Sequence, residues 1–262
     1  MKVDSPAGTL LIALILAVGS SLLISVTAVS LKPRQDYYRE LDRNKNVLIA
    51  AGLFKFGQKQ KIEDLFKKIN VVFVNTETGE VRENMDVDIY FKNLSKIVTN
   101  SETSIKLSAA EDIAGIKSIA KYVPVYVLGD DKEISQVVIP IYGKGLWSTL
   151  YGFLAVKSDG KTVHGITFYE HGETPGLGGE VDNPRWKQLW SGKLLFDENW
   201  NSKIEVIKGI VQDGSIEAQY KVDGLSGATL TSRGVDHLVK FWISRKGIKT
   251  FLMNIGTMEV VF

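Results

Sequence analysis

Residues 122–169 read YVPVYVLGDDKEISQVVIPIYGKGLWSTLYGFLAVKSDGKTVHGITFY and contain four candidate strands in a row. Runs rich in Val, Ile and Tyr cover residues 122–128, 134–142, 151–156 and 163–169. Gly129-Asp130-Asp131 separates the first two runs and Ser158-Asp159-Gly160 the last two, and such segments are typical of tight hairpin turns. Consecutive strands joined in this way predict an antiparallel sheet with flanking helices, which is an α+β domain.

Shorter elements are predicted upstream of this run. Residues 37–53 mix charged and apolar side chains in a helical pattern, and residues 61–69 place their apolar side chains on one helical face. Residues 71–74 and Val81 flank the turn Thr76-Glu77-Thr78-Gly79, which predicts another hairpin.

The remaining segments give a weaker signal. Residues 86–120 have no clear pattern, and residues 204–211 predict one more strand. Asn183 followed by Pro184 predicts the start of a short helix, because Asn caps helices and Pro fits their first position. That helix is expected to include Trp186, Leu189 and Trp190.

The first thirty residues carry an uncharged apolar segment. No charged side chain lies between Ser5 and Leu31, and Ala7 to Val29 is long enough for the roughly 20 residues of a spanning helix. A signal peptide, with Val26-Thr27-Ala28 as a weak cleavage pattern, is the alternative, but its apolar region would be about 7–15 residues long. We therefore predict an uncleaved single-pass anchor, and its lack of ionisable side chains means that it offers no ion site by itself.

Composition limits the possible chemistry. The formal net charge is +2 and the Lys and Arg residues are spread along the chain, so no basic stripe indicates a nucleic-acid partner. Cysteine is absent, which excludes disulfides, thiolate-bound iron–sulfur clusters and Cys-type zinc sites. His164, His171 and His237 are too dispersed to form a metal motif, so we predict no metal site. A redox role would need an organic cofactor.

The stretch DGLSGATLTS at residues 223–232 precedes a predicted helix. Apolar residues at positions 235, 238, 239, 242 and 243 have the spacing of one helical stripe. A helix N-terminus favours an anion, and phosphate is the usual one. The hydroxyl residues of the stretch could cap the helix, or one of them could carry a covalently attached phosphate; they are Ser226, Thr229, Thr231 and Ser232.

Two further glycine-rich stretches are ambiguous by themselves. HGETPGLGGE at residues 171–180 has four glycines in eight residues, which allow close backbone approach, yet an ordinary surface loop is the better interpretation of it alone. Gly143-Lys144-Gly145 is weak evidence of a phosphate loop, since no Lys-Ser/Thr pair follows. We expect the nearby Trp147 in the core or in an interface. Ser226 fails the Gly-x-Ser-x-Gly hydrolase signature at Ala228, so we predict no catalytic nucleophile.

Two of these stretches resemble one protein family. Asp223-x-x-Ser226-Gly227-Ala228-Thr229 is similar to the flavinylation motif of the FMN-binding subunits of the Na+-translocating NADH:quinone oxidoreductase and its Rnf relatives. Glu173-Thr174-Pro175-Gly176-Leu177-Gly178 resembles another stretch of that family. The length and the Ser-Gly-Ala-Thr-Leu-Thr-Ser run favour the NqrC branch, with the RnfG branch as the nearer alternative.

The resemblance implies a covalent flavin. FMN is expected to be joined through its phosphate to the hydroxyl of Thr229, within an FMN-binding part at residues 121–262. Backbone N–H groups of the 171–178 loop would bond the flavin, Leu177 or Pro175 would cover a ring face, and the two titratable groups of the loop would tune its protonation. The expected cofactor-binding residues are His171, Glu173, Thr174, Pro175, Gly176, Leu177, Gly178, Gly145, Trp147, Asp223, Ser226, Gly227, Ala228, Thr229, Leu230 and Thr231.

The resemblance also implies a place in a six-subunit membrane complex, whose other members are NqrA, NqrB, NqrD, NqrE and NqrF. This chain would receive electrons from an iron–sulfur centre held by NqrD and NqrE and pass them to the FMN of NqrB, while NqrF oxidises NADH. A flavin transferase that acts during maturation is a further expected partner. The rival from another class is a membrane-anchored module that binds a phosphorylated ligand without a covalent bond.

The charges that follow the anchor and the family resemblance predict opposite membrane topologies. The predicted parts are an anchor at residues 1–31, a helical or mixed part at residues 32–120 and the FMN-binding part at residues 121–262. Five cations follow the anchor and only Lys2 precedes it, which would place the large domain in the cytoplasm. The resemblance implies the periplasmic side of a bacterial inner membrane, and we follow the resemblance. The five cations are Lys32, Arg34, Arg39, Arg43 and Lys45.

Overall fold

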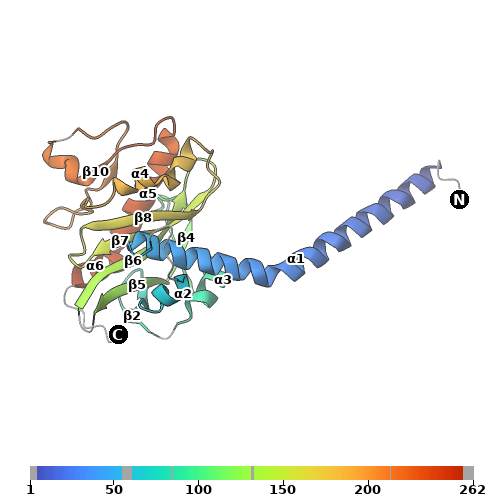
Figure 1. The fold of residues 1–262 in the computed structure, drawn as a ribbon, viewed down its shortest axis with the longest axis horizontal. Coiled ribbons are helices and arrows are strands. Elements are labelled where there is room, and N and C mark those ends of the chain that lie inside the picture. The colour runs from blue at the N-terminus through green and yellow to red at the C-terminus, as the bar shows by residue number, and fades with distance from the viewer. Residues whose placement is uncertain (1–4, 55–60, 84, 131–132, 213, 256–262) are drawn as a thin grey trace. The chain divides into compact units, whose positions relative to one another are not determined.

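The computed structural model describes residues 5–54, 61–83, 85–130, 133–212 and 214–255 (Figure 1). It divides into two compact units, Met1–Asp42 and Arg43–Phe262. The turn predicted at residues 129–131 lies partly outside the described residues.

Helix α1, Pro6–Ala50, is one continuous helix of 45 residues. The sequence predicted two helical segments, and the structure joins them through Pro33, which lies inside the helix. Among the described helices, α1 is the one that is long and apolar enough to cross a membrane. The predicted N-terminal helix is therefore confirmed, and it extends further than expected.

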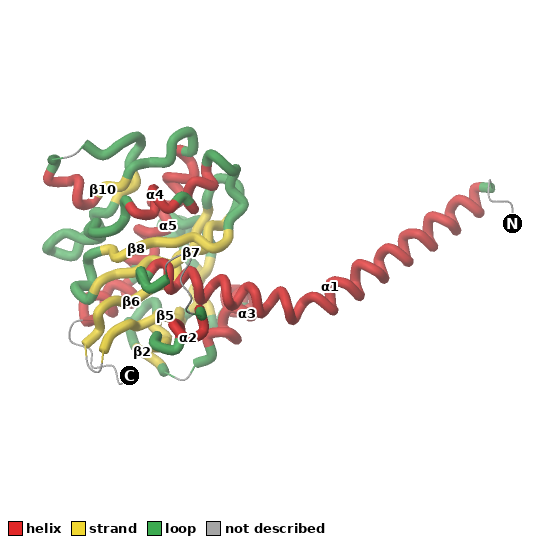
Figure 2. The backbone as a smooth tube through the Cα atoms, in the orientation of Figure 1, coloured by secondary structure: helices red, strands yellow, loops and turns green. Residues whose placement is uncertain are grey.

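The second unit is built on a six-stranded antiparallel sheet, with strand order β2-β1-β5-β6-β7-β8 (Figures 1 and 2). The four predicted strands between residues 122 and 169 are confirmed as β5 to β8, and the predicted upstream hairpin is confirmed as β1 and β2. The strands are β1 (Asn70–Asn75), β2 (Val81–Arg82), β5 (Tyr122–Asp130), β6 (Glu133–Lys144), β7 (Thr149–Lys157) and β8 (Val163–Glu170).

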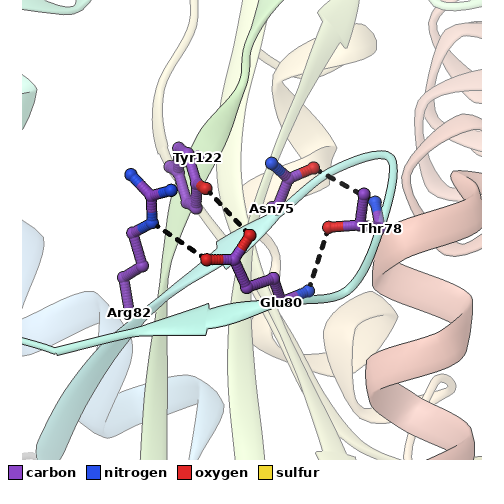
Figure 3. Close-up of polar contacts among 5 residues, drawn as sticks. All are labelled: Asn75, Thr78, Glu80, Arg82 and Tyr122. Carbon is purple, nitrogen blue, oxygen red and sulfur yellow. Dashed lines mark hydrogen bonds and ion pairs between the residues drawn. The ribbon is translucent and has the colours of Figure 1, made fainter.

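Side-chain hydrogen bonds fix the β1–β2 hairpin at the edge of the sheet (Figure 3). The Asn75 Oδ1 atom accepts the N–H group of Thr78 at 3.1 Å, and the Thr78 hydroxyl accepts the N–H group of Glu80 at 3.2 Å. The Glu80 carboxylate accepts Arg82 Nε at 3.2 Å and the Tyr122 hydroxyl at 3.3 Å, which connects β2 to the start of β5. These bonds hold a strand of two residues in register.

The sheet separates two apolar layers because alternate residues of each strand face opposite sides. In β5, Val125 and Val127 belong to one cluster, which also contains the buried side chains of α5 (Thr229–Ser244) and α6 (Lys246–Asn254). Tyr126 belongs to the other cluster, with the last residues of α1 and with α2 (Ile62–Phe66). The fold is an α+β domain with helices on both faces of an antiparallel sheet, as predicted.

The end of α1 is fixed to helix α3 (Val87–Thr99) and to the sheet by polar groups. Arg43 is 7% exposed, pairs with Asp88 and lies with its guanidinium group 4.6 Å from the ring centroid of Phe91. The Thr167 hydroxyl donates to the carbonyl of Asn46 at 3.2 Å. The Arg43 side chain is buried and the Asp88 side chain is 36% exposed, so this ion pair is only partly removed from water.

Some elements differ from the predictions. The strand expected at residues 204–211 is only β9 (Glu205–Val206), which pairs in parallel with β10 (Lys221–Val222). Asn183 caps α4 (Pro184–Gln188) as predicted, but Leu189 and Trp190 follow the helix instead of lying in it. Residues 86–120, left unassigned, contain α3 (Val87–Thr99), β3 (Ser104–Lys106) and β4 (Ser118–Ala120). The other elements are the short helices η1 (Gly178–Asp182) and η2 (Ile216–Tyr220).

Candidate functional site

The four hydroxyl residues before and at the start of α5 have separate environments. Thr231 and Ser232 are buried, where the Thr231 hydroxyl donates to Glu173 and Ser232 Oγ accepts the N–H group of Leu225 at 2.8 Å. Ser226 and Thr229 are exposed. The site therefore presents two of the four hydroxyl groups to solvent.

Helix α5 begins without a side-chain cap. Ala228 occupies the N-cap position, so of the two alternatives for the hydroxyl residues the structure does not show the helix cap. The Ser232 N–H group donates to the Ala228 carbonyl at 2.9 Å and closes the first turn. The N–H groups of residues 229–231 precede that bond and have no partner within the helix. This leaves the positive end of the helix available to an anion beside Thr229.

Thr229 lies at a cavity of about 280 Å³ between α5 and the segment that follows β9. Lys208 and Arg233 are exposed cations in its wall, and His237 adds an imidazole. The Asp236 carboxylate already has two hydrogen-bond partners. It accepts the N–H group of Val206 and the ammonium group of Lys240, both at 2.9 Å. The complete lining is Glu205, Val206, Ile207, Lys208, Gly209, Gly224, Leu225, Thr229, Ser232, Arg233, Asp236 and His237.

Asp223 and Gly224 hold the wall of this cavity in place. The Asp223 carboxylate accepts the N–H group of Val211 at 2.7 Å, and its backbone carbonyl accepts Trp186 Nε1 at 2.8 Å. Gly224 donates its N–H group to the Gly209 carbonyl at 2.9 Å, and a β-carbon at position 224 would collide with the backbone of the 207–209 segment. Both residues therefore position the 207–211 segment beside Thr229.

Glu173 connects the β6–β7 loop to α5. Its Oε1 atom accepts the N–H groups of Trp147 at 3.0 Å and Ser148 at 3.1 Å. Its Oε2 atom accepts the N–H group of Leu146 at 3.2 Å and the hydroxyl of Thr231 at 2.6 Å. Burial raises the pKa of the Glu173 carboxyl group. The four hydrogen bonds together lower this pKa by more than burial raises it, so it lies below its ordinary value.

The rest of the 171–178 loop is held by its own hydrogen bonds. The Glu173 N–H group donates to His171 Nδ1 at 3.2 Å, so the opposite nitrogen, Nε2, carries the proton and donates to Asp182 at 2.8 Å. The Thr174 carbonyl accepts the N–H groups of Leu177 and Gly179 and closes a turn. The tip of that turn, Pro175-Gly176, is exposed, with Gly176 at a φ of +74°.

Apolar side chains from three segments are exposed around the start of α5. Trp147 is 68% exposed, so the expectation of a core position is wrong, while an interface position stays a prediction. Leu146 and Leu230 are exposed too. Leu177 is 45% exposed, and its Cδ2 atom lies 3.0 Å from where a β-carbon on Gly227 would be, so this loop tip contacts the 223–232 stretch. The structure thus brings the three predicted stretches together.

Several residues of the site were not predicted. Arg233 and His237 lie four and eight positions after Thr229 on α5, and helical spacing alone is a signal that could have found them. Lys208 lies in the segment that was expected to be a strand. Ser148, whose hydroxyl accepts the Gly172 N–H group at 2.6 Å, follows the Gly-x-Gly stretch closely and gave no signal of its own.

Comparison with known proteins identifies the family. Residues 145–244 match the FMN-binding domain model. The chain is 44% identical to the Na(+)-translocating NADH-quinone reductase NqrC protein of Pseudomonas aeruginosa over 98% of each chain, and 41% identical to that of Yersinia pestis over 96% of this chain and 94% of that protein. The crystal structure of Shewanella oneidensis NqrC superposes with a TM-score of 0.72 at 38% identity, covering 82% of this chain and 96% of that one. The family predicted from the two motifs is confirmed: this chain belongs to the NqrC family of Na(+)-translocating NADH-quinone reductases and contains an FMN-binding domain.

Proposed function

We propose that the chain carries FMN in a phosphodiester bond to the Thr229 hydroxyl and relays electrons within a membrane-bound Na(+)-translocating NADH-quinone reductase. The observation that carries this proposal is the position of Thr229. Its exposed hydroxyl lies at the uncapped start of α5 and in the wall of the cavity. Ser226, the other exposed hydroxyl residue of the stretch, does not line that cavity.

The residues around Thr229 suit a phosphodiester. The N–H groups of the first helical turn point toward an anion at this position. Lys208 and Arg233 in the cavity wall supply positive charge, and the arginine fork suits phosphate oxygens. Attachment would form one phosphate ester bond to Thr229, displace the group bonded to the FMN phosphate in the donor, and release the hydroxyl proton.

The exposed apolar side chains suit the flavin ring system. Trp147, Leu177 and Leu230 are large, solvent-facing and attached to segments that meet at the start of α5. Cover by such groups would remove apolar area of both partners from water. When bound, FMN supplies electron transfer one electron at a time, and a covalent tether prevents its loss by dissociation from a solvent-facing site.

The names of the relatives support the rest of the proposal. They are NqrC proteins of Na(+)-translocating NADH-quinone reductases, which favours this assignment over RnfG. Within such a complex we place this chain beside NqrA, NqrB, NqrD, NqrE and NqrF, between an iron–sulfur centre and the FMN of NqrB. The apolar part of helix α1 would lie in the inner membrane and the FMN domain in the periplasm. A flavin transferase would act on the chain during maturation.

Denaturing electrophoresis tests the attachment site. The full chain, produced with the matching flavin transferase, is expected to give a band that fluoresces under ultraviolet light and an intact mass increased by one FMN. Thr229→Ala should remove both signals, because Ser232, the other hydroxyl residue of the cavity lining, is buried and bonded to Leu225. Thr229→Ser should retain them in part. Ser244→Ala, at the exposed last residue of α5, removes a hydroxyl outside the motif, so it is the control and should keep the adduct.

The rival module with a non-covalent phosphorylated ligand predicts a different pattern. It gives no fluorescent band after denaturation, even for the wild-type chain. A fluorescent band that persists in Thr229→Ala would show that another residue is the acceptor, and the assignment of Thr229 would then be wrong.

A further inference from the structure

Glu173 is a buried carboxylate on which three segments of the candidate site converge. It is 5% exposed and sits in the 171–178 loop. Its acceptor bonds reach the β6–β7 loop through the N–H groups of residues 146–148 and reach α5 through the Thr231 hydroxyl. One side chain thus joins two loops to the first turn of the helix that bears Thr229.

The surrounding backbone is shaped to admit this carboxylate. A β-carbon on Gly145 would lie 2.6 Å from Glu173 Oε1. A β-carbon on Gly178 would lie 2.8 Å from Glu173 Oε2 and 2.5 Å from Thr231 Oγ1. Real β-carbons do not approach oxygen so closely, so glycine at both positions leaves room for the Glu173–Thr231 contact. The Glu173–Thr231 contact therefore depends on glycine at positions 145 and 178.

The chemistry of the contact explains why it would matter. A carboxylate that accepts four hydrogen bonds is held in one orientation, and bonds to a charged acceptor are stronger than neutral ones. The first turn of α5 has no side-chain cap, so it lacks the restraint that helix starts usually have. The Thr231 hydroxyl bond replaces that restraint two residues after Thr229. A turn held in this way presents the Thr229 hydroxyl in a fixed position.

We propose that Glu173 is a positioning residue for cofactor attachment, which fixes the first turn of α5 through Thr231 and the β6–β7 loop through its own hydrogen bonds before FMN is bound. This inference rests on the proposed attachment at Thr229. It assigns Glu173 a structural connection to the acceptor turn, in place of the direct tuning of flavin protonation expected from the sequence.

The test measures the rate of FMN attachment to the folded full chain. Apo-protein in detergent is incubated with the matching flavin transferase and its flavin donor, and the fraction with an FMN adduct is followed by intact mass. The variants are Glu173→Gln, Thr231→Val, which removes the hydroxyl at nearly constant shape, and Thr231→Ser, which restores it. All are assayed well below their unfolding temperatures, and rates are divided by the folded fraction.

Two controls separate positioning from general stability. Glu170→Gln removes an exposed carboxylate three residues upstream. Val127→Ala opens a cavity in the fully buried core of β5 and lowers the unfolding temperature without touching the network. Both should attach FMN at the wild-type rate. Thr231→Val and Glu173→Gln should be slower by about tenfold, the scale of one lost hydrogen bond to a charged group, and Thr231→Ser should be close to wild type.

Each outcome decides the proposal. Because both residues act through one bond, the double variant should be no slower than the slower single variant. A wild-type attachment rate in Thr231→Val would overturn the role of the bond. So would a double variant whose rate is reduced by the product of the two single reductions. If Glu173→Gln does not fold, Thr231→Val still provides the test. If even the wild-type chain forms no adduct, the proposed function fails instead.

Discussion

Glu173 is ionised wherever the protein is folded at neutral pH, and this has a consequence for acid stability. Burial raises the pKa of its carboxyl group, but the hydrogen bonds from Thr231 and the β6–β7 loop lower this pKa by a larger amount. The folded pKa is therefore below the unfolded value of about 4.3. A depressed carboxyl pKa stabilises the folded state above the unfolded pKa. That contribution is lost as pH falls through the folded pKa.

We therefore expect Glu173→Gln to reduce the pH dependence of stability on the acid side. The difference in unfolding free energy between the wild-type chain and the variant should be constant between about pH 6 and 7 and should shrink below about pH 4.3, where the unfolded carboxyl is protonated. Urea unfolding of the full chain in detergent, at a series of pH values, measures it. Glu170→Gln, which alters an exposed carboxylate, should follow the wild-type curve, and an equal difference at every pH would contradict the assignment.

Single residues show where sequence reasoning stops. The motif neighbours of Thr229 predict it as the attachment residue, and this stays a prediction; the structure shows that the residue is exposed. The hydrogen bond from Thr231 to Glu173 was not predictable, because the two residues lie 58 positions apart in the chain. Trp147 was expected in the core or in an interface, yet its backbone N–H group donates to Glu173 and the residue is 68% exposed. Only the fold reveals such pairings.

At the scale of elements, Gly234 determines how closely α5 approaches the β6–β7 loop. A β-carbon on this buried helical residue would lie 2.5 Å from the Lys144 carbonyl oxygen and 3.0 Å from Gly145 Cα. Alanine favours an exposed helix by about 1 kcal/mol over glycine. Here the backbone of the loop cannot withdraw as a flexible side chain would, so the steric cost exceeds the gain in helix propensity.

Gly234→Ala should accordingly lower the unfolding temperature and displace α5 from the loop that Glu173 holds. The expected loss is about 1–3 kcal/mol, the usual cost of overpacking. Ser244→Ala, at the exposed last residue of the same helix, should change stability by less than about 0.5 kcal/mol. Thermal unfolding monitored by circular dichroism compares the two, and a more stable Gly234→Ala would show that the loop moves freely.

The elements also explain which parts of the fold were predictable. The strands β5 to β8 were predicted from runs rich in Val, Ile and Tyr between turn residues, and helix α5 from the helical spacing of its apolar residues. Residues 207–211 have a strand-like composition, but the Asp223 carboxylate and Gly224 bind their backbone in place of a neighbouring strand. Helix α3 was missed although Asp86 caps it, with Oδ1 accepting the N–H groups of Asp88 and Ile89. That cap was a local signal that the sequence reasoning did not use.

For the whole molecule, the side of the membrane that holds the FMN domain is the remaining question. The cations after the apolar segment favour a cytoplasmic domain. That charge rule applies to short loops, however, and long domains translocate largely regardless of charge. The segment that follows the apolar part of α1 contains the entire folded unit Arg43–Phe262, so it falls outside the range of the rule. Similarity to NqrC of Pseudomonas aeruginosa covers 98% of the chain and therefore includes most or all of the N-terminal helix.

We expect the FMN domain to be digested when protease is added to intact spheroplasts of cells that produce the full chain and its flavin transferase. The fluorescent band at full length should disappear if, as proposed, the domain lies in the periplasm and only the apolar part of α1 lies in the bilayer. A cytoplasmic marker protein should remain intact and serves as the control for lysis. In inverted membrane vesicles the same band should be protected. Digestion in inverted vesicles but not in spheroplasts would place the domain in the cytoplasm, in agreement with the loop charges and against the proposed periplasmic relay.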